Sequence, residues 1–183
     1  MWRLGIIFFA LMFSFSIDAK DTELKLYRPF VEEKKLAIIQ KTSGECWQQS
    51  KRIQREDAWR CTVGEKVYDP CFVKPHGSLK TALCPQSPWN SDTVEIDLVS
   101  PVDGSQNVTL DMSEAYPWAL ELTTGEKCQA VDEGEEYDGL PVHYHCDGQT
   151  ILIGRVQRCT TLWRMLQKNT AGVSTTFIAR AWF

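Results

Sequence analysis

The sequence lacks the features that would assign an enzymatic activity or a nucleic-acid partner directly. It holds only three histidines, and it contains neither a Gly-x-Ser-x-Gly nor a His-Glu-x-x-His motif, so two common hydrolase signatures are absent. The net charge is −4 and lysine and arginine are scattered, which argues against nucleic-acid binding. No cofactor-binding signature is present. We therefore expect no cofactor and no nucleic-acid partner.

The first nineteen residues have the pattern of a secretory signal peptide. Arg3 supplies a positive charge, and residues 4–15 form an apolar run that is too short to cross a bilayer as a stable helix. Cleavage before Ile17 or before Lys20 fits this pattern, and the second site is favoured. We predict a secreted or periplasmic protein of about 164 residues with no membrane span after cleavage, the alternative being an uncleaved anchor.

Seven cysteines follow this segment, and in an oxidising compartment most of them are expected to pair. Seven cysteines allow about 105 arrangements of three bridges. Spacing favours pairing between consecutive cysteines, which closes loops of roughly 14 to 19 residues, each worth about 3 kcal/mol by chain entropy. This predicts the bridges Cys46–Cys61, Cys71–Cys84 and Cys128–Cys146. Cys159 is then a free thiol, either a small buried hydrophobe or a reactive or intermolecular thiol.

Alternating apolar and polar residues predict a mainly β chain. Strands are expected over residues 36–40, 94–98, 118–122, 142–146, 150–153, 162–166 and 175–182, with a hairpin turn at Asp147-Gly148. Proline and glycine punctuate residues 46–88. We predict an antiparallel sheet or small barrel with a disulfide-stapled, loop-rich N-terminal half. It would form one domain over residues 44–183, without an internal repeat, behind a charged leader segment at 20–43.

Several short motifs occur in an order that resembles a group of uncharacterised exported bacterial proteins, many of them from actinobacteria. The resemblance covers residues 44–183, and Cys159 lies outside its pattern. It implies export and the same disulfide pairing, but it implies no activity. The motifs are Gly44-Glu45-Cys46-Trp47, Asp57-Ala58-Trp59-Arg60-Cys61, Tyr68-Asp69-Pro70-Cys71-Phe72, Cys84-Pro85, Pro117-Trp118-Ala119-Leu120-Glu121-Leu122 with Gly125 and Cys128, Tyr144-x-Cys146, and Ala181-Trp182.

Two clusters are candidates for metal binding. His143 and His145 lie two residues apart in a predicted strand, so their side chains share a face and could begin a metal site. The alternative is a pair of exposed strand histidines. A neighbouring acidic loop offers oxygen ligands for calcium, although it lacks EF-hand spacing and a solvated loop is the simpler interpretation. Its acids are Asp132, Glu133, Glu135, Glu136 and Asp138.

Catalytic residues cannot be assigned from these patterns. Cys159 would form a thiol–imidazole pair if the fold brought it to His143 or His145. Asp57 and Asp69 would be the paired acids of a glycoside hydrolase, or they accept backbone hydrogen bonds in turns. No local signature supports either kind of enzyme, so we leave the catalytic residues unassigned.

Tryptophan is plentiful after the predicted signal peptide, and its bulky, amphipathic side chain serves either a core or a ligand surface. Trp47 and Trp59 adjoin cysteines and are expected to pack on the disulfides. Trp89 and Trp118 each follow a proline and are expected to be exposed, where they would stack on a sugar ring or grip a protein. Trp163 and Trp182 complete the set.

These observations favour a secreted or periplasmic binding module whose partner is a cell-envelope glycan or a protein. A small secreted hydrolase or thiol enzyme is the alternative from another class. In addition, Tyr144-x-Cys146-Asp147-Gly148 resembles the start of small periplasmic β-barrel lysozyme inhibitors. An inhibitor of a lysozyme-like enzyme is therefore a further alternative.

Overall fold

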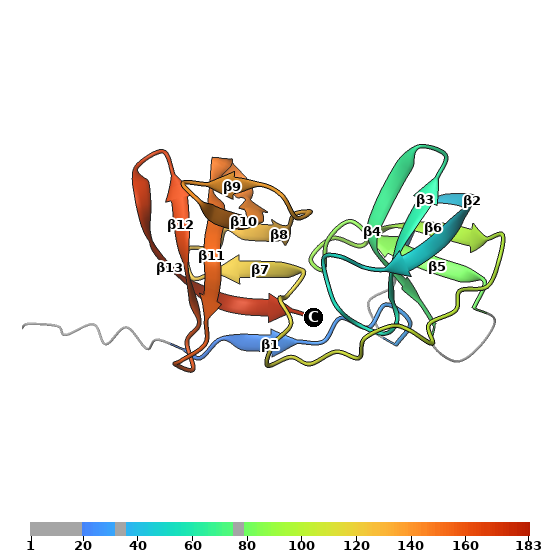
Figure 1. The fold of residues 1–183 in the computed structure, drawn as a ribbon, viewed down its shortest axis with the longest axis horizontal. Helices are drawn as coiled ribbons and strands as arrows, with labels where there is room; N and C mark the ends of the chain where they lie inside the picture. Colours follow the sequence, from blue (N-terminus) through green and yellow to red (C-terminus); the bar gives the residue numbers. More distant parts are fainter. Residues whose placement is uncertain (1–19, 32–35, 75–78) are drawn as a thin grey trace, which may run out of the picture.

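The protein is described by a computed structural model that covers residues 20–31, 36–74 and 79–183. Its chain forms two small β-barrels that lie side by side and are joined by a long connection (Figure 1). The predicted mainly β, disulfide-stapled fold is confirmed. The predicted signal peptide lies outside the described residues. Within those residues, no helix is long and apolar enough to cross a membrane.

The first barrel is a meander of five strands. Consecutive strands are antiparallel. Because their number is odd, the first and last strands run in the same direction, and the barrel closes through a parallel pair between them. The strands are β2 (Ala37–Gln49), β3 (Ala58–Val63), β4 (Lys66–Val73), β5 (Thr81–Pro85) and β6 (Asp92–Leu98). The predicted alternation of β6 is confirmed, since Val94, Ile96 and Leu98 are all buried.

The second barrel closes differently because its meander has an even number of main strands. Its first and last strands, β7 and β13, therefore meet antiparallel. The main strands are β7 (Ala119–Leu122), β8 (Lys127–Ala130), β10 (Leu140–Cys146), β11 (Ile151–Gln157), β12 (Arg164–Asn169) and β13 (Gly172–Trp182). The short β9 (Glu136–Tyr137) pairs with the start of β10, and a 3-10 turn at Asp147–Gln149 separates β10 from β11.

A short strand from the beginning of the described chain completes the second barrel. β1 (Glu23–Lys25) lies parallel to the end of β13. The buried Thr22 hydroxyl donates to the carbonyl of Ile178 (2.7 Å) and accepts from the amide of Trp163 (2.8 Å). Tyr27 is also buried. The segment predicted as a charged leader thus contributes a strand and core residues.

The three predicted disulfides are present. Cys46–Cys61 joins directly opposite residues of β2 and β3, and Cys128–Cys146 does the same for β8 and β10. Cys71–Cys84 joins β4 to β5. Cys159 is free, as predicted, but it is exposed in the connection between β11 and β12, so its interpretation as a buried hydrophobe is wrong.

The two strand pairs whose disulfides join directly opposite residues share a short pattern, although no internal repeat was expected from the sequence. In each barrel Gly-Glu stands just before the first cysteine, and a buried aromatic residue stands two positions before the second. The matching pieces are Gly44-Glu45-Cys46 with Trp59-Arg60-Cys61, and Gly125-Glu126-Lys127-Cys128 with Tyr144-His145-Cys146. The same kind of disulfide-stapled strand pair therefore occurs once in each barrel.

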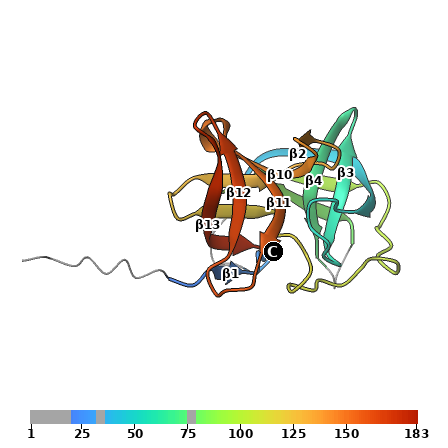
Figure 2. The same ribbon diagram turned by 60° about the vertical axis from the view of Figure 1, so that its left-hand side comes forward.

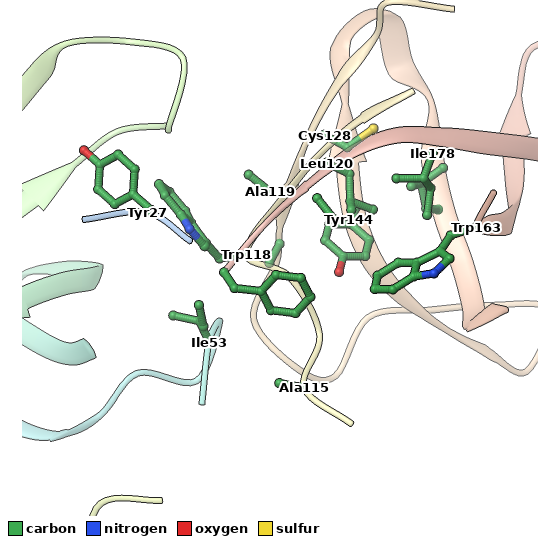
Figure 3. Packing of buried hydrophobic residues seen from close by; sticks show 14 of the residues in the cluster. Tyr27, Ile53, Ala115, Trp118, Ala119, Leu120, Cys128, Tyr144, Trp163 and Ile178 are labelled. Atoms are coloured by element: carbon green, nitrogen blue, oxygen red, sulfur yellow. The ribbon is translucent and has the colours of Figure 1, made fainter. Parts of the chain in front are cut away.

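The two barrels share one apolar joint. The largest buried cluster contains Ile53 and Phe72 from the first barrel, Tyr27 from the N-terminal segment, and most of the second barrel's interior. Trp118 lies in this joint, with its ring edge-on to Tyr27 (centroids 5.4 Å apart) and to Phe72 (6.1 Å). Figure 3 shows the indole between Tyr27 and the residues of the second barrel.

The guanidinium of Arg55 fastens the joint with polar contacts. It pairs with both carboxylate oxygens of Asp57 and lies over the ring of Phe72 at 4.6 Å. It also donates to the backbone carbonyls of Tyr27 (2.6 Å) and Phe183 (3.1 Å). The end of β13 lies between the barrels in both views (Figure 1, Figure 2). The Arg55 side chain of the first barrel thus binds the backbone of the segments that follow β1 and β13.

Candidate functional site

A cleft of about 220 Å³ opens beside the joint, where the two barrels meet. Four segments form its walls: the β2–β3 loop of the first barrel, the connection between β6 and β7, the loop after β8, and β10. The lining residues are Lys51, Arg52, Ile53, Gln54, Glu114, Ala115, Tyr116, Ala130, Val131, Glu133, His143 and Tyr144. Both barrels are therefore needed to form this site.

An aromatic pair forms one wall of the cleft. The rings of Tyr116 and His143 are stacked, with centroids 4.3 Å apart and planes inclined by 19°. Both side chains are half-buried, so part of each ring is open. His143 is the extra residue at a β-bulge between Val142 and Tyr144 of β10. Bulges re-aim side chains, which explains how a residue in a closed barrel can stack on the neighbouring connection.

Hydrogen bonds hold the connection that carries Tyr116. The guanidinium of Arg158 donates to the backbone carbonyls of Met112 (3.1 Å), Ser113 and Ala115, and it lies over the ring of Trp163. The buried Tyr144 hydroxyl donates to the carbonyl of Pro117 (2.7 Å). The Tyr116 backbone is thus fixed on both sides by side chains of the second barrel, so the aromatic wall exists before a ligand arrives.

Burial lowers the pKa of His143 below its usual value, an effect that the nearby Glu133 carboxylate partly opposes. The shift favours the neutral imidazole at pH 7, with one ring nitrogen that donates and one that accepts. A neutral ring stacked on tyrosine presents a polar edge without a formal charge. This suits hydroxyl groups better than it suits ions.

The remaining polar residues of the cleft balance in charge. Lys51 and Arg52 line it on the side of the first barrel, while Glu114 and Glu133 line it from the other segments. Two cations and two anions leave no net charge to recruit a charged ligand. Their ammonium, guanidinium and carboxylate groups nevertheless supply both donors and acceptors.

Arg52 also takes part in a salt-bridge network between the barrels. Its Nε donates to Asp132 in the loop after β8 (3.1 Å), and its Nη1 donates to the backbone carbonyl of Asp69 (3.0 Å). Arg60 binds the other carboxylate oxygen of Asp132 at 3.0 Å. Asp132, one of the loop acids considered as a calcium ligand, thus accepts from two arginines, and these ion pairs hold one edge of the cleft.

The two aspartates considered as paired catalytic acids are both occupied in structural contacts. Asp57 holds Arg55. Asp69 accepts from the Ser50 hydroxyl and from the backbone amide of Lys51. Burial raises the pKa of the Asp69 carboxyl, although these hydrogen bonds and the nearby Arg52 and Arg60 oppose the rise. Asp69 thus accepts a backbone hydrogen bond, as expected for a turn-stabilising acid, whereas Asp57 binds a side-chain guanidinium instead.

The predicted histidine pair is divided between two environments. His143 stacks on Tyr116 in the cleft, whereas the exposed His145 places Nε2 at 2.8 Å from the Glu135 carboxylate. In the part of the chain that the structure describes, one group of three or more candidate metal ligands converges, namely Cys61, Cys71 and Cys84. All three are in disulfides. The metal site at His143 and His145 therefore stays a prediction. Cys159, considered as a thiol partner for these histidines, does not line the cleft.

The predicted exposure of Trp118 is wrong. Its side chain is only 2% exposed, because Tyr27 and Phe72, distant in sequence, close over it. Trp89 is partly buried and packs edge-on against Trp182 at 5.5 Å. Trp59 is buried with the disulfide cysteines, as expected, whereas Trp47 is 48% exposed. Neither Trp89 nor Trp118 lines the cleft.

No protein-family model, curated protein or solved structure matches this chain. The geometry of the cleft therefore carries the functional assignment.

Tyr116 and Arg158 are the residues of the site that sequence reasoning missed. A weak signal exists for Tyr116, which stands beside Pro117-Trp118 at the end of a polar connection. No sequence pattern marks Arg158, because its three carbonyl acceptors are distant in the chain.

The pH dependence of stability is expected to reveal His143. The unfolded chain protonates this residue near pH 6.5, whereas the folded protein does so only at lower pH. The stabilising contribution of the neutral ring is therefore complete above about pH 6.5 and is lost as the pH falls below it. Urea unfolding between about pH 5 and 7.5 measures the effect. His143→Gln should have a shallower acid-side decline, and identical slopes for the two proteins would contradict the prediction.

Proposed function

We propose that the protein is an exported binding module that holds a neutral saccharide in the cleft between its barrels. The observation that carries this proposal is the stacked Tyr116–His143 pair, which lies among polar residues of balanced charge. Aromatic faces contact the apolar face of a sugar ring. Hydroxyl groups, which both donate and accept, match the surrounding side chains.

The size of the cleft supports a small ligand or one end of a longer chain. Its volume of about 220 Å³ is below the roughly 300–1,000 Å³ typical of sites for drug-sized molecules. One or two sugar rings fit this scale better than an extended polymer. The predicted export would place the site where cell-envelope or extracellular glycans occur.

Saccharide binding is tested with the full-length exported protein and neutral soluble sugars. Saturation-transfer NMR and titration calorimetry would use glucose, N-acetylglucosamine and its di- and trisaccharides. We expect weak binding that Tyr116→Ala and His143→Ala each weaken about tenfold or more, because each removes part of the aromatic wall. The matched control is Trp47→Ala, which removes an exposed aromatic side chain outside the cleft.

Binding that survives both cleft substitutions, or that Trp47→Ala abolishes, would contradict the proposal. Preference for charged over neutral sugars would also contradict it, because the lining carries no net charge. The same samples followed over days test the hydrolase alternative. A binding module leaves the disaccharide and trisaccharide intact.

A further inference from the structure

The first barrel contains an opened seam between β4 and β5. These strands pair only at Phe72 with Leu83 and at Val73 with Ala82, and the Cys71–Cys84 disulfide follows directly. The next position in the same register sets Pro70 opposite Pro85. Proline has no amide hydrogen, so the ladder cannot continue through this pair. The first half of β4 therefore leaves β5 although both strands extend beyond the pairing.

A groove of about 320 Å³ occupies this seam. Its walls come from residues 66–70 of β4, the end of β5, residues 39 and 40 of β2, and Val94 of β6. Two apolar side chains on it are unusually open to solvent, since Ile39 is 54% exposed and Val67 is 43% exposed. Ile39 is the extra residue at a bulge in β2. The seam thus combines an interrupted strand pairing with exposed apolar side chains.

The backbone of β4 presents one of its hydrogen-bonding edges toward this groove. Val63 and Lys66 pair across the two-residue turn Gly64-Glu65, where Gly64 has φ +59°. In such a hairpin the residues flanking the turn bond to each other, and the bonding alternates along the ladder. Val67 is the next residue, so its amide and carbonyl face away from β3, toward the seam.

Two cations and one acid line the groove, and one of the cations, Arg52, is already bonded to Asp132 and to the Asp69 carbonyl. Arg52 and Lys66 line it, and the Lys66 ammonium lies over the ring of Tyr68 at 4.6 Å. The acid among the lining residues is Asp69, whose side chain is buried and bonded to Ser50 and Lys51. An acidic group on an incoming ligand would therefore meet a cation rather than a competing carboxylate.

We propose that this seam is a docking site for an extended segment of a partner polypeptide, which adds to β4 as a strand. A polypeptide is the ligand that supplies alternating amides and carbonyls at the spacing of a strand edge. Apolar side chains at alternate positions of the segment contact Ile39 and Val67, and an acidic residue beside them contacts Lys66. This groove shares Arg52 with the proposed saccharide cleft, but its other lining residues are different, and the proposal does not depend on saccharide binding.

The experiment uses capped hexapeptides as probes of the intact, oxidised protein. One peptide alternates valine and threonine and ends in glutamate, a second replaces the valines with phenylalanine, and a third replaces the glutamate with lysine. Matched controls carry N-methyl groups on alternate amides, which remove the donors of one peptide edge. Backbone amide NMR shifts and hydrogen exchange report where each peptide binds. We expect shifts over residues 66–69 and 39–40, slowed exchange of the Val67 amide, and tighter binding of the glutamate than of the lysine peptide.

Variants distinguish specific binding at the β4 edge from non-specific hydrophobic binding of the peptides. The double variant I39T/V67T retains β-branched residues but removes apolar contacts, and it should raise Kd about tenfold. The matched control V173T alters an exposed valine on β13 and should leave Kd unchanged. Equal binding of N-methylated and unmodified peptides would overturn the proposal. So would shifts confined to the cleft, concentration-dependent dimerisation through the seam in place of peptide binding, or no binding of any peptide at millimolar concentration.

Discussion

Replacing Trp118 with alanine is expected to destabilise the protein by about 3–5 kcal/mol, the range for large-to-small changes of a buried aromatic residue. Trp118 packs against Tyr27 and Phe72, so its removal leaves a cavity where the barrels and the N-terminal segment meet. Neighbours from three separate parts of the chain cannot all move in to fill that cavity. Urea unfolding monitored by circular dichroism measures the loss.

The matched control for this prediction is Trp47→Ala, which removes the same side chain from a position that is 48% exposed. We expect a change below about 1 kcal/mol there. Trp118→Phe should cost less than Trp118→Ala, because phenylalanine keeps much of the aromatic volume and leaves a smaller cavity. In the described structure the buried indole nitrogen has no hydrogen-bond partner, so neither variant loses a hydrogen bond there. Similar losses for the two alanine variants would show that Trp118 is not central to the joint.

Replacing Arg55 with methionine is expected to cost about 3–5 kcal/mol, because it removes one partner of a buried ion pair. The Arg55 side chain is 5% exposed. Its loss would leave the Asp57 carboxylate and the carbonyls of Tyr27 and Phe183 without their shared donor. Thermal and urea unfolding with the disulfides intact measure the change.

Arg180→Met is the matched control, since Arg180 pairs with Glu23 and Glu121 but its side chain is 46% exposed. We expect a loss below about 1 kcal/mol for this surface arginine. Adding Asp57→Asn to Arg55→Met should recover part of the lost stability, because the uncompensated buried charge is then removed. If both arginine variants unfolded alike, Arg55 would not fasten the joint.

Features that depend on neighbours in the sequence were predictable. The disulfides join strands that are close in the chain, such as β2 with β3, so spacing alone favoured the correct partners. Alternation of Val94, Ile96 and Leu98 likewise reported one buried face of a strand. The prolines at positions 70 and 85 were less informative. They indicated loops, but they lie inside β4 and β5 at the seam where those strands separate.

Features that depend on distant contacts were not predictable from the same patterns. Strand alternation shows which face of a strand is buried, but it does not show which strands pair to close a barrel. The same alternation is therefore expected from a chain that forms one barrel and from a chain that forms two. Trp118 was expected at the surface because its partners Tyr27 and Phe72 are remote in sequence. The cleft was missed for the same reason, since Tyr116 and His143 belong to different segments.

The pairing of β1 with β13 sets an order for folding during synthesis. The strands of the first barrel pair among themselves over residues 37–98, so that barrel can close while the ribosome is still adding the second half of the chain. β1 emerges earlier but must wait for β13, and the Thr22 hydroxyl waits for Ile178, which lies 156 residues further on. The first strand of the described structure is therefore among the last to reach its native position.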